Sequence, residues 1–140
     1  MIDFSDFCDR FVRPPWADLE YRPRLRKPLR LLCERMPVEV YQNLPLITIV
    51  APPEWGYVIV LPVPAPGGRV IFLASQLDRR DVSRELADFA VAHAFARVAL
   101  GHGATTKAAD ARAADRLVKQ WGYKIPVYRG RFRILVDGGL

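Results

Sequence analysis

The residues best suited to chemistry lie on one short stretch, Phe89 to Leu100, which reads FAVAHAFARVAL. Ten of its twelve residues are apolar, and the other two are His93 and Arg97. These two are four positions apart, so on an α-helix they lie one turn apart on the same face. Two ionisable groups on an otherwise apolar helix indicate a buried polar site rather than a solvated surface.

A third ionisable residue, Asp115, falls on the core-facing stripe of a second predicted helix. The simplest arrangement places Asp115 against His93 or Arg97, because a buried charge is costly unless it is paired. Such a trio could be a polar network that only holds two helices together. It could also be a site in which His93 and Asp115 act as an acid–base pair. No nucleophile motif or phosphate-binding loop accompanies them, which disfavours that second interpretation.

The flanking residues predict the two helices that carry this trio. Ser83 is a good N-cap, and Gly101 is a good stop for a helix between them. A second helix is expected from Lys107 to Trp121. The first of these helices is apolar nearly all round, which is typical of a central, buried helix.

Upstream, three runs rich in β-branched residues predict a small, largely antiparallel sheet over 46–50, 57–61 and 70–74. Pro52 and Pro62 at strand ends predict at least one edge strand. We therefore expect a single α+β domain over 1–140. Its parts are N-terminal helices over 1–44, the sheet over 45–75, two core helices over 83–122 and an extended segment over 123–140.

The N-terminal region predicts one helix from Asp3 to Val12 and another that starts at Pro28, a residue suited to a first helical turn. Cys8 and Cys33 form no CxxC pair and are expected to be reduced thiols. The N-terminus lacks the features of a signal peptide, and no apolar run is long enough to span a membrane. We expect a cytoplasmic protein with no membrane association.

The net charge of +6 is concentrated in two segments, 22–35 and 116–133. We expect mainly a solvated basic surface there. An acidic protein or nucleic acid stays possible as a partner, although no known nucleic-acid-binding motif or aromatic platform accompanies the bases.

The stretch from residue 71 to 102 and the segment 111–123 together resemble the core of a zincin metallopeptidase. The resemblance is to minimal gluzincins and related bacterial single-domain proteins, and it covers roughly residues 69–124. In these families a strand precedes a helix with the motif HExxH, and a second helix carries ExxxD. The resemblance places the first zinc histidine at His93, and it places at Asp115 the aspartate that hydrogen-bonds this histidine.

The other catalytic positions have changed. Ala94 stands where the family has its general-base glutamate, Arg97 where it has the second zinc histidine, and Ala111 where it has the third ligand. Arginine cannot ligate a metal, and catalytic zinc needs three protein ligands. We therefore expect no cofactor, no bound metal and no catalytic residue, with His93 as a residual ligand position. A rescued site shared by His93 and His102 would need the loop after the first core helix to fold back.

These changes predict a catalytically inactive, zincin-like protein that acts by binding. We expect Arg97 to replace the zinc ion electrostatically and to pair with Asp115. A protein or peptide partner is expected in a groove beside an edge strand at Val70 to Ser75. Two alternatives stay open: an active zinc metallopeptidase with non-standard ligands, and a nucleic-acid-binding protein that uses its basic surface.

Overall fold

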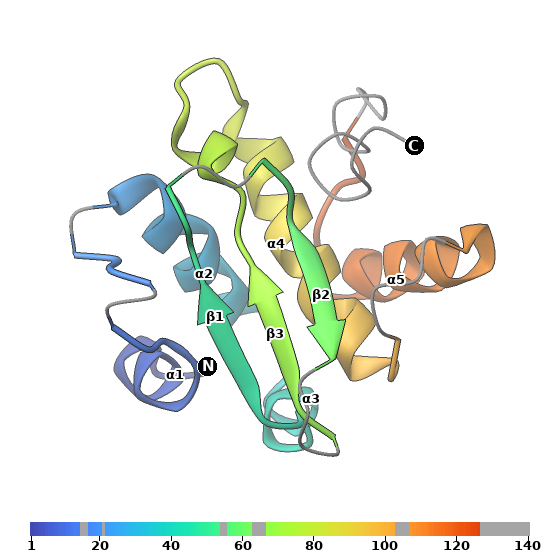
Figure 1. Cartoon of the computed structure of the whole chain (residues 1–140). Coiled ribbons are helices and arrows are strands. Elements are labelled where there is room, and N and C mark those ends of the chain that lie inside the picture. Colours follow the sequence, from blue (N-terminus) through green and yellow to red (C-terminus); the bar gives the residue numbers. More distant parts are fainter. Residues whose placement is uncertain (15–16, 21, 54–55, 63–66, 103–106, 127–140) are drawn as a thin grey trace.

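The computed structural model describes residues 1–14, 17–20, 22–53, 56–62, 67–102 and 107–126, and Figure 1 shows their arrangement. Within these ranges, five helices and a three-stranded sheet confirm the predicted α+β class. From position 127 onward, the extended segment predicted over 123–140 lies outside the described residues. The elements are α1 (Phe4–Phe11), α2 (Pro23–Arg35), α3 (Val38–Gln42), β1 (Ile47–Val50), β2 (Ile59–Pro62), β3 (Arg69–Phe72), the 3-10 turn η1 (Ser75–Asp78), α4 (Arg84–Ala99) and α5 (Ala108–Gln120).

The strands lie in the order β1-β3-β2, so the last strand in the chain is the central one. β1 runs parallel to β3, with Ile47 opposite Arg69, and β2 runs antiparallel to β3, with Ile59 opposite Phe72. The sheet is therefore mixed rather than largely antiparallel. The chain passes from β1 to the far edge of the sheet before a hairpin returns β3 to the middle. The spacing of strands along a sequence does not reveal that the last strand inserts between the first two.

The central position of β3 corrects the predicted groove beside Val70 to Ser75. Val70 has a neighbouring strand on each side, so no free edge exists there for an added strand. Ser75 has already left the sheet and begins η1. On the outer side of β1, Ile49 forms a parallel bridge with Val12. Among the described residues, the outer edge of β2 has no strand or bridge partner, whereas the outer edge of β1 has the single bridge to Val12.

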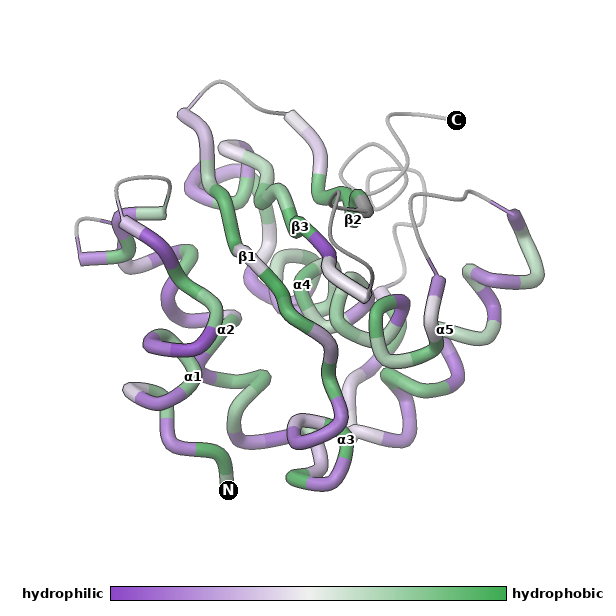
Figure 2. Tube along the Cα trace, turned by 60° about the horizontal axis from the view of Figure 1, so that its bottom comes forward, coloured by the Kyte–Doolittle hydropathy of each residue, from purple (hydrophilic) through white to green (hydrophobic). Residues whose placement is uncertain are grey.

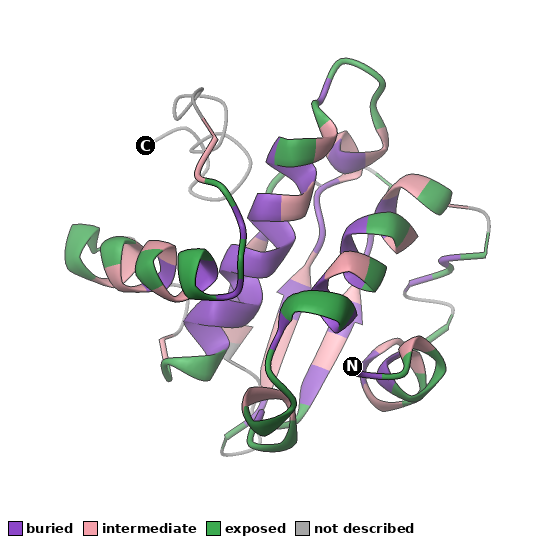
Figure 3. Cartoon of the chain, turned by 180° about the vertical axis from the view of Figure 1, so that it is seen from behind, coloured by how far each residue is buried: buried purple, intermediate pink, exposed green. Residues whose placement is uncertain are grey.

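Helices α2 and α4 lie together on one face of the sheet, as Figures 1 and 3 show from opposite sides. Apolar residues follow the strands and α4, and they appear green in Figure 2. The fully buried sheet side chains facing this layer are Ile47, Ile49, Val60 and Ile71. The opposite face is half-buried, with Thr48, Val50, Ile59, Leu61, Val70 and Phe72.

Helix α2 begins at Pro23, so the prediction that it starts at Pro28 is wrong. Pro28 lies inside the helix, where it has no N–H to donate to the carbonyl of Arg24 four residues earlier. That carbonyl instead accepts a hydrogen bond of 3.2 Å from Nη1 of Arg84 on α4. A side chain from a neighbouring helix thus satisfies the group that the proline leaves open.

Across the described ranges, every helix is too short or too polar to traverse a bilayer.

Candidate functional site

Helix α4 is the central element of the site, and its limits agree with the predicted cap and stop. The hydroxyl of Ser83 accepts a hydrogen bond from the backbone N–H of Leu86 at 3.2 Å. Gly101, at the other end, has φ +77, a conformation that glycine adopts readily. Between Leu86 and Val98 every residue except Asp88 is buried, and the middle of α4 is purple in Figure 3. Polar groups on this helix are therefore held inside the protein.

His93 and Asp115 meet where α4 packs against α5. Nε2 of His93 lies 3.4 Å from Oδ1 of Asp115, and the two side chains are 2% and 17% exposed. The residues are 22 positions apart in sequence, so the packing of two helices brings them together. The structure thus places next to each other the two site residues that match the zincin pattern.

Arg97 follows His93 by one turn of α4 and is 4% exposed. Its carbonyl oxygen accepts a 2.8 Å hydrogen bond from the backbone N–H of His102, which closes the end of the helix. Burial of a guanidinium requires that its charge be compensated. The pairing of Arg97 with Asp115 stays a prediction.

The two remaining positions of the pattern are apolar. Ala94 is 1% exposed beside His93, and Ala111 is half-buried on α5. Neither can ligate a metal or accept a proton. Throughout the described ranges, no three His, Cys, Asp or Glu side chains are grouped so that they could hold a metal ion. Zinc needs three protein ligands, so His93 and Asp115 do not fit the zinc ion that the resemblance implies.

His102 contacts a different acid of α5. Its Nε2 lies 3.6 Å from Oδ1 of Asp110, with both side chains about a quarter exposed (21% and 26%). Each histidine therefore faces its own aspartate across the α4–α5 pair: His93 faces Asp115, and His102 faces Asp110. A metal site shared by the two histidines gains no support from this arrangement.

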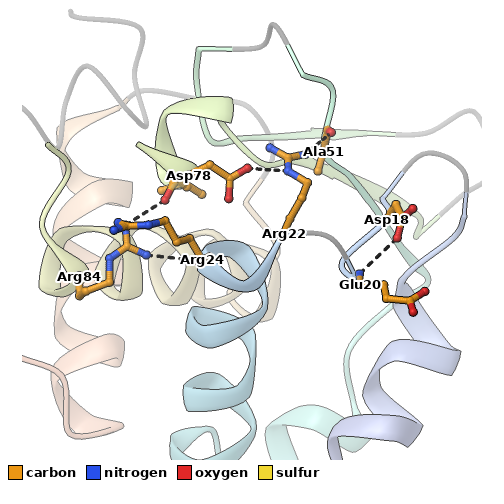
Figure 4. A network of polar contacts seen from close by, with 8 residues as sticks. Asp18, Glu20, Arg22, Arg24, Ala51, Asp78 and Arg84 are labelled. Carbon is orange, nitrogen blue, oxygen red and sulfur yellow. Dashed lines mark hydrogen bonds and ion pairs between the residues drawn. The ribbon is translucent and has the colours of Figure 1, made fainter. Parts of the chain in front are cut away.

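A network of arginines near the start of α2 is a feature that sequence reasoning missed (Figure 4). Arg22 forms an ion pair with Asp78 of η1 and donates to the carbonyl of Ala51 at 2.6 Å. Arg84 donates to the carbonyls of Arg24, Leu77 and Val82. These arginines tie α2, η1 and α4 together, so part of the first basic segment is structural. The sequence alone does not reveal which of the bases spread through 22–35 have partners.

A second polar feature, also missed, lies where α2, α4 and the residues after α5 meet. Burial raises the pKa of the Asp88 carboxyl, while the positive charges of Arg84, Lys27 and Arg35 partly oppose this. Tyr123 is 5% exposed, and burial raises the pKa of its phenol as well. In the described part of the chain, neither the Tyr123 hydroxyl nor Oδ1 of Asp88 has a hydrogen-bond partner. The only sequence signal was an acid within the apolar helix.

Comparison with known proteins identifies no relative: no family model, no curated protein and no solved structure matches this chain.

Proposed function

We propose that this chain is a zincin-like domain that has lost its zinc site, has no peptidase activity and acts by binding a protein or peptide. The observation that carries the proposal is the contact between His93 and Asp115 at 3.4 Å. The zincin pattern implies this contact between the first histidine and the aspartate of the second helix. The order of strand β3, helix α4 and helix α5 is also the order that the pattern requires.

The loss of zinc follows from the residues at the changed positions. Arg97 stays protonated and cannot act as a ligand, and Ala94 cannot take a proton from water. We propose that Arg97 supplies a fixed positive charge where the metal would sit, beside Asp115. Ala94 and Ala111 leave room for its long side chain. The burial of Arg97, at 4% exposure, supports an internal structural charge rather than a substrate-binding one.

The proposed binding surface is the outer edge of β2. Its backbone groups from Ile59 to Leu61 lie at the end of the sheet, where an extended peptide could add as a fourth strand. β2 also packs near α4, the helix that carries His93. Two free cysteines agree with a reducing, cytoplasmic setting, which stays part of the proposal.

Measurement of bound metal tests the proposal that the zinc site has been lost. The full chain is expressed in zinc-supplemented medium and purified without chelator, and bound metal is measured by mass spectrometry. We expect far less than one zinc per chain and no thermal shift when zinc is added. One tightly bound zinc per chain would instead support an active metallopeptidase with other ligands.

Amide hydrogen exchange tests the proposal that a peptide binds at the outer edge of β2. Extended peptides selected from a displayed library on the full chain serve as probes. A peptide that adds to the sheet should slow exchange of β2 amides, Ile59 to Leu61, and leave the amides of β1 unchanged. Peptides that bind without protecting β2, or a failure to select any peptide, would refute this surface.

A further inference from the structure

Helix α5 separates its charges by face. Its acids, Asp110 and Asp115, turn toward His102 and His93. Its exposed bases, Arg112, Arg116 and Lys119, follow at intervals of four and three residues, so they share the outward face. We call these three residues the basic face of α5. No hydrogen bond or ion pair joins any of them to another described residue.

The first basic segment differs, because several of its arginines already have partners. Arg22 pairs with Asp78, and Arg35 donates to the carbonyl of Gly122 at 3.2 Å and lies over the Tyr123 ring. Arg30 lies over the ring of Phe4. Among the described residues, Arg26 and Lys27 of that segment also lack a hydrogen-bonding partner, but Arg26 is half-buried, whereas all three bases of α5 are exposed along one face.

The chemistry of the basic face favours a phosphate backbone over a folded acidic protein. Specific protein interfaces need buried aromatic or large aliphatic anchors at their centre. The exposed side of α5 offers only small or polar residues around its bases, namely Ala108, Ala109 and Gln120. The nearby aromatic rings of Trp121 and Tyr123 are each 5% exposed, so they cannot stack on bases of a single strand.

The spacing of the basic face also suits a duplex. Arg112 to Lys119 spans roughly 10 Å along the helix axis at about 1.5 Å per residue. Duplex phosphates follow one another every 3.4 Å or so along each strand, so this length covers about three phosphates. We propose that the basic face of α5 binds the backbone of double-stranded nucleic acid without sequence preference. This goes beyond the proposed peptide binding and uses a different surface.

Fluorescence anisotropy with the full chain and a labelled 20-base-pair DNA duplex tests the proposal. Three neutralised phosphates predict a slope near −2.7 for the logarithm of the binding constant against the logarithm of salt, or roughly 40-fold weaker binding at 200 mM than at 50 mM. The variant Arg112→Gln/Arg116→Gln/Lys119→Gln should lose most of the binding and of the salt dependence.

A variant with the same loss of charge serves as the control. Arg26→Gln/Lys27→Gln/Arg80→Gln changes bases outside α5 that have no hydrogen-bonding partner among the described residues. It should retain at least half of the affinity. No binding at 50 mM salt, an equal loss in both variants, or tighter binding to polyglutamate than to the duplex would overturn the proposal. Circular dichroism verifies that both variants stay folded.

Discussion

Arg84 donates to the carbonyl that Pro28 leaves without a hydrogen bond inside α2, and replacing Arg84 should reveal this compensation directly. Its guanidinium donates to the carbonyls of Arg24, Leu77 and Val82 at 3.2, 2.9 and 3.3 Å. Each bond from a charged donor contributes about 1 to 1.5 kcal/mol at a partly exposed position. Arg84→Met, which keeps much of the side chain's volume, should therefore lower the free energy of unfolding by roughly 3 to 4.5 kcal/mol.

The cost should shrink when Pro28 is replaced by alanine. Pro28→Ala restores a backbone N–H that can bond to the Arg24 carbonyl, so this carbonyl no longer needs Arg84. Arg84→Met should then cost about 1 to 1.5 kcal/mol less than in the natural chain, a coupling worth about 4 °C in melting temperature. In Pro28→Ala alone, loss of the buried ring opposes the stabilisation from the restored hydrogen bond.

Urea unfolding of the four proteins, followed by circular dichroism, measures this coupling. The pair Arg80→Met and Pro28→Ala is the control and should be additive, because Arg80 is exposed. Additivity within about 0.5 kcal/mol for Arg84 and Pro28, or a coupling of opposite sign, would refute the assignment of the Arg24 carbonyl to Arg84.

Three further predictions concern buried polar groups. Arg97→Met and Asp115→Asn should each destabilise the fold, and urea unfolding should give a coupling of roughly 1 to 3 kcal/mol; additive effects would contradict their pairing. Burial raises the pKa of Asp88 above its ordinary value of 3.8, so the folded state binds this proton more tightly than the unfolded state does. Protonation of Asp88 therefore stabilises the folded state fully below pH 3.8, and this stabilisation is lost as the pH rises through the pKa that Asp88 has in the folded protein. Asp88→Asn should therefore raise the free energy of unfolding at pH 7 but not near pH 3. Urea unfolding at the two pH values measures this, and an equal increase at both would disprove it. Burial raises the pKa of the Cys33 thiol to about 12, so in iodoacetamide labelling at pH 8 the half-buried Cys8 should react first. Rapid labelling of Cys33 in the folded protein, detected by mass spectrometry, would be the contrary result.

Local signals in the sequence predicted the helices that build the site. Ser83 and Gly101 mark the ends of α4 because a cap and a left-handed stop depend on neighbouring residues alone. The inward face of α5 was likewise visible from its periodicity, which placed Asp115 toward α4. The contact between His93 and Asp115 follows once two such helices pack together.

The sheet and the arginines could not be predicted in the same way. The order β1-β3-β2 depends on long-range pairing, so Val70 was placed at an edge although it lies in the central strand. The start of α2 was missed because Pro28 normally ends or begins a helix, and the compensating Arg84 is 56 residues away. Tertiary contacts likewise decide which bases are paired and which stay exposed. Arg22, for example, pairs with Asp78, which lies far from it in the sequence.

Introducing the zincin residues tests the central proposal, that this chain is a zincin-like domain without its metal. The variant Ala94→Glu/Arg97→His/Ala111→Glu rebuilds the pattern around His93 and Asp115. A control with glutamate at position 113 instead of 111 adds the same charge on another side of α5. We predict one zinc per chain for the rebuilt site, with stabilisation of about 4 kcal/mol at zinc concentrations 1,000 times the Kd, and no zinc for the control. A folded, rebuilt variant that binds no zinc would contradict the account.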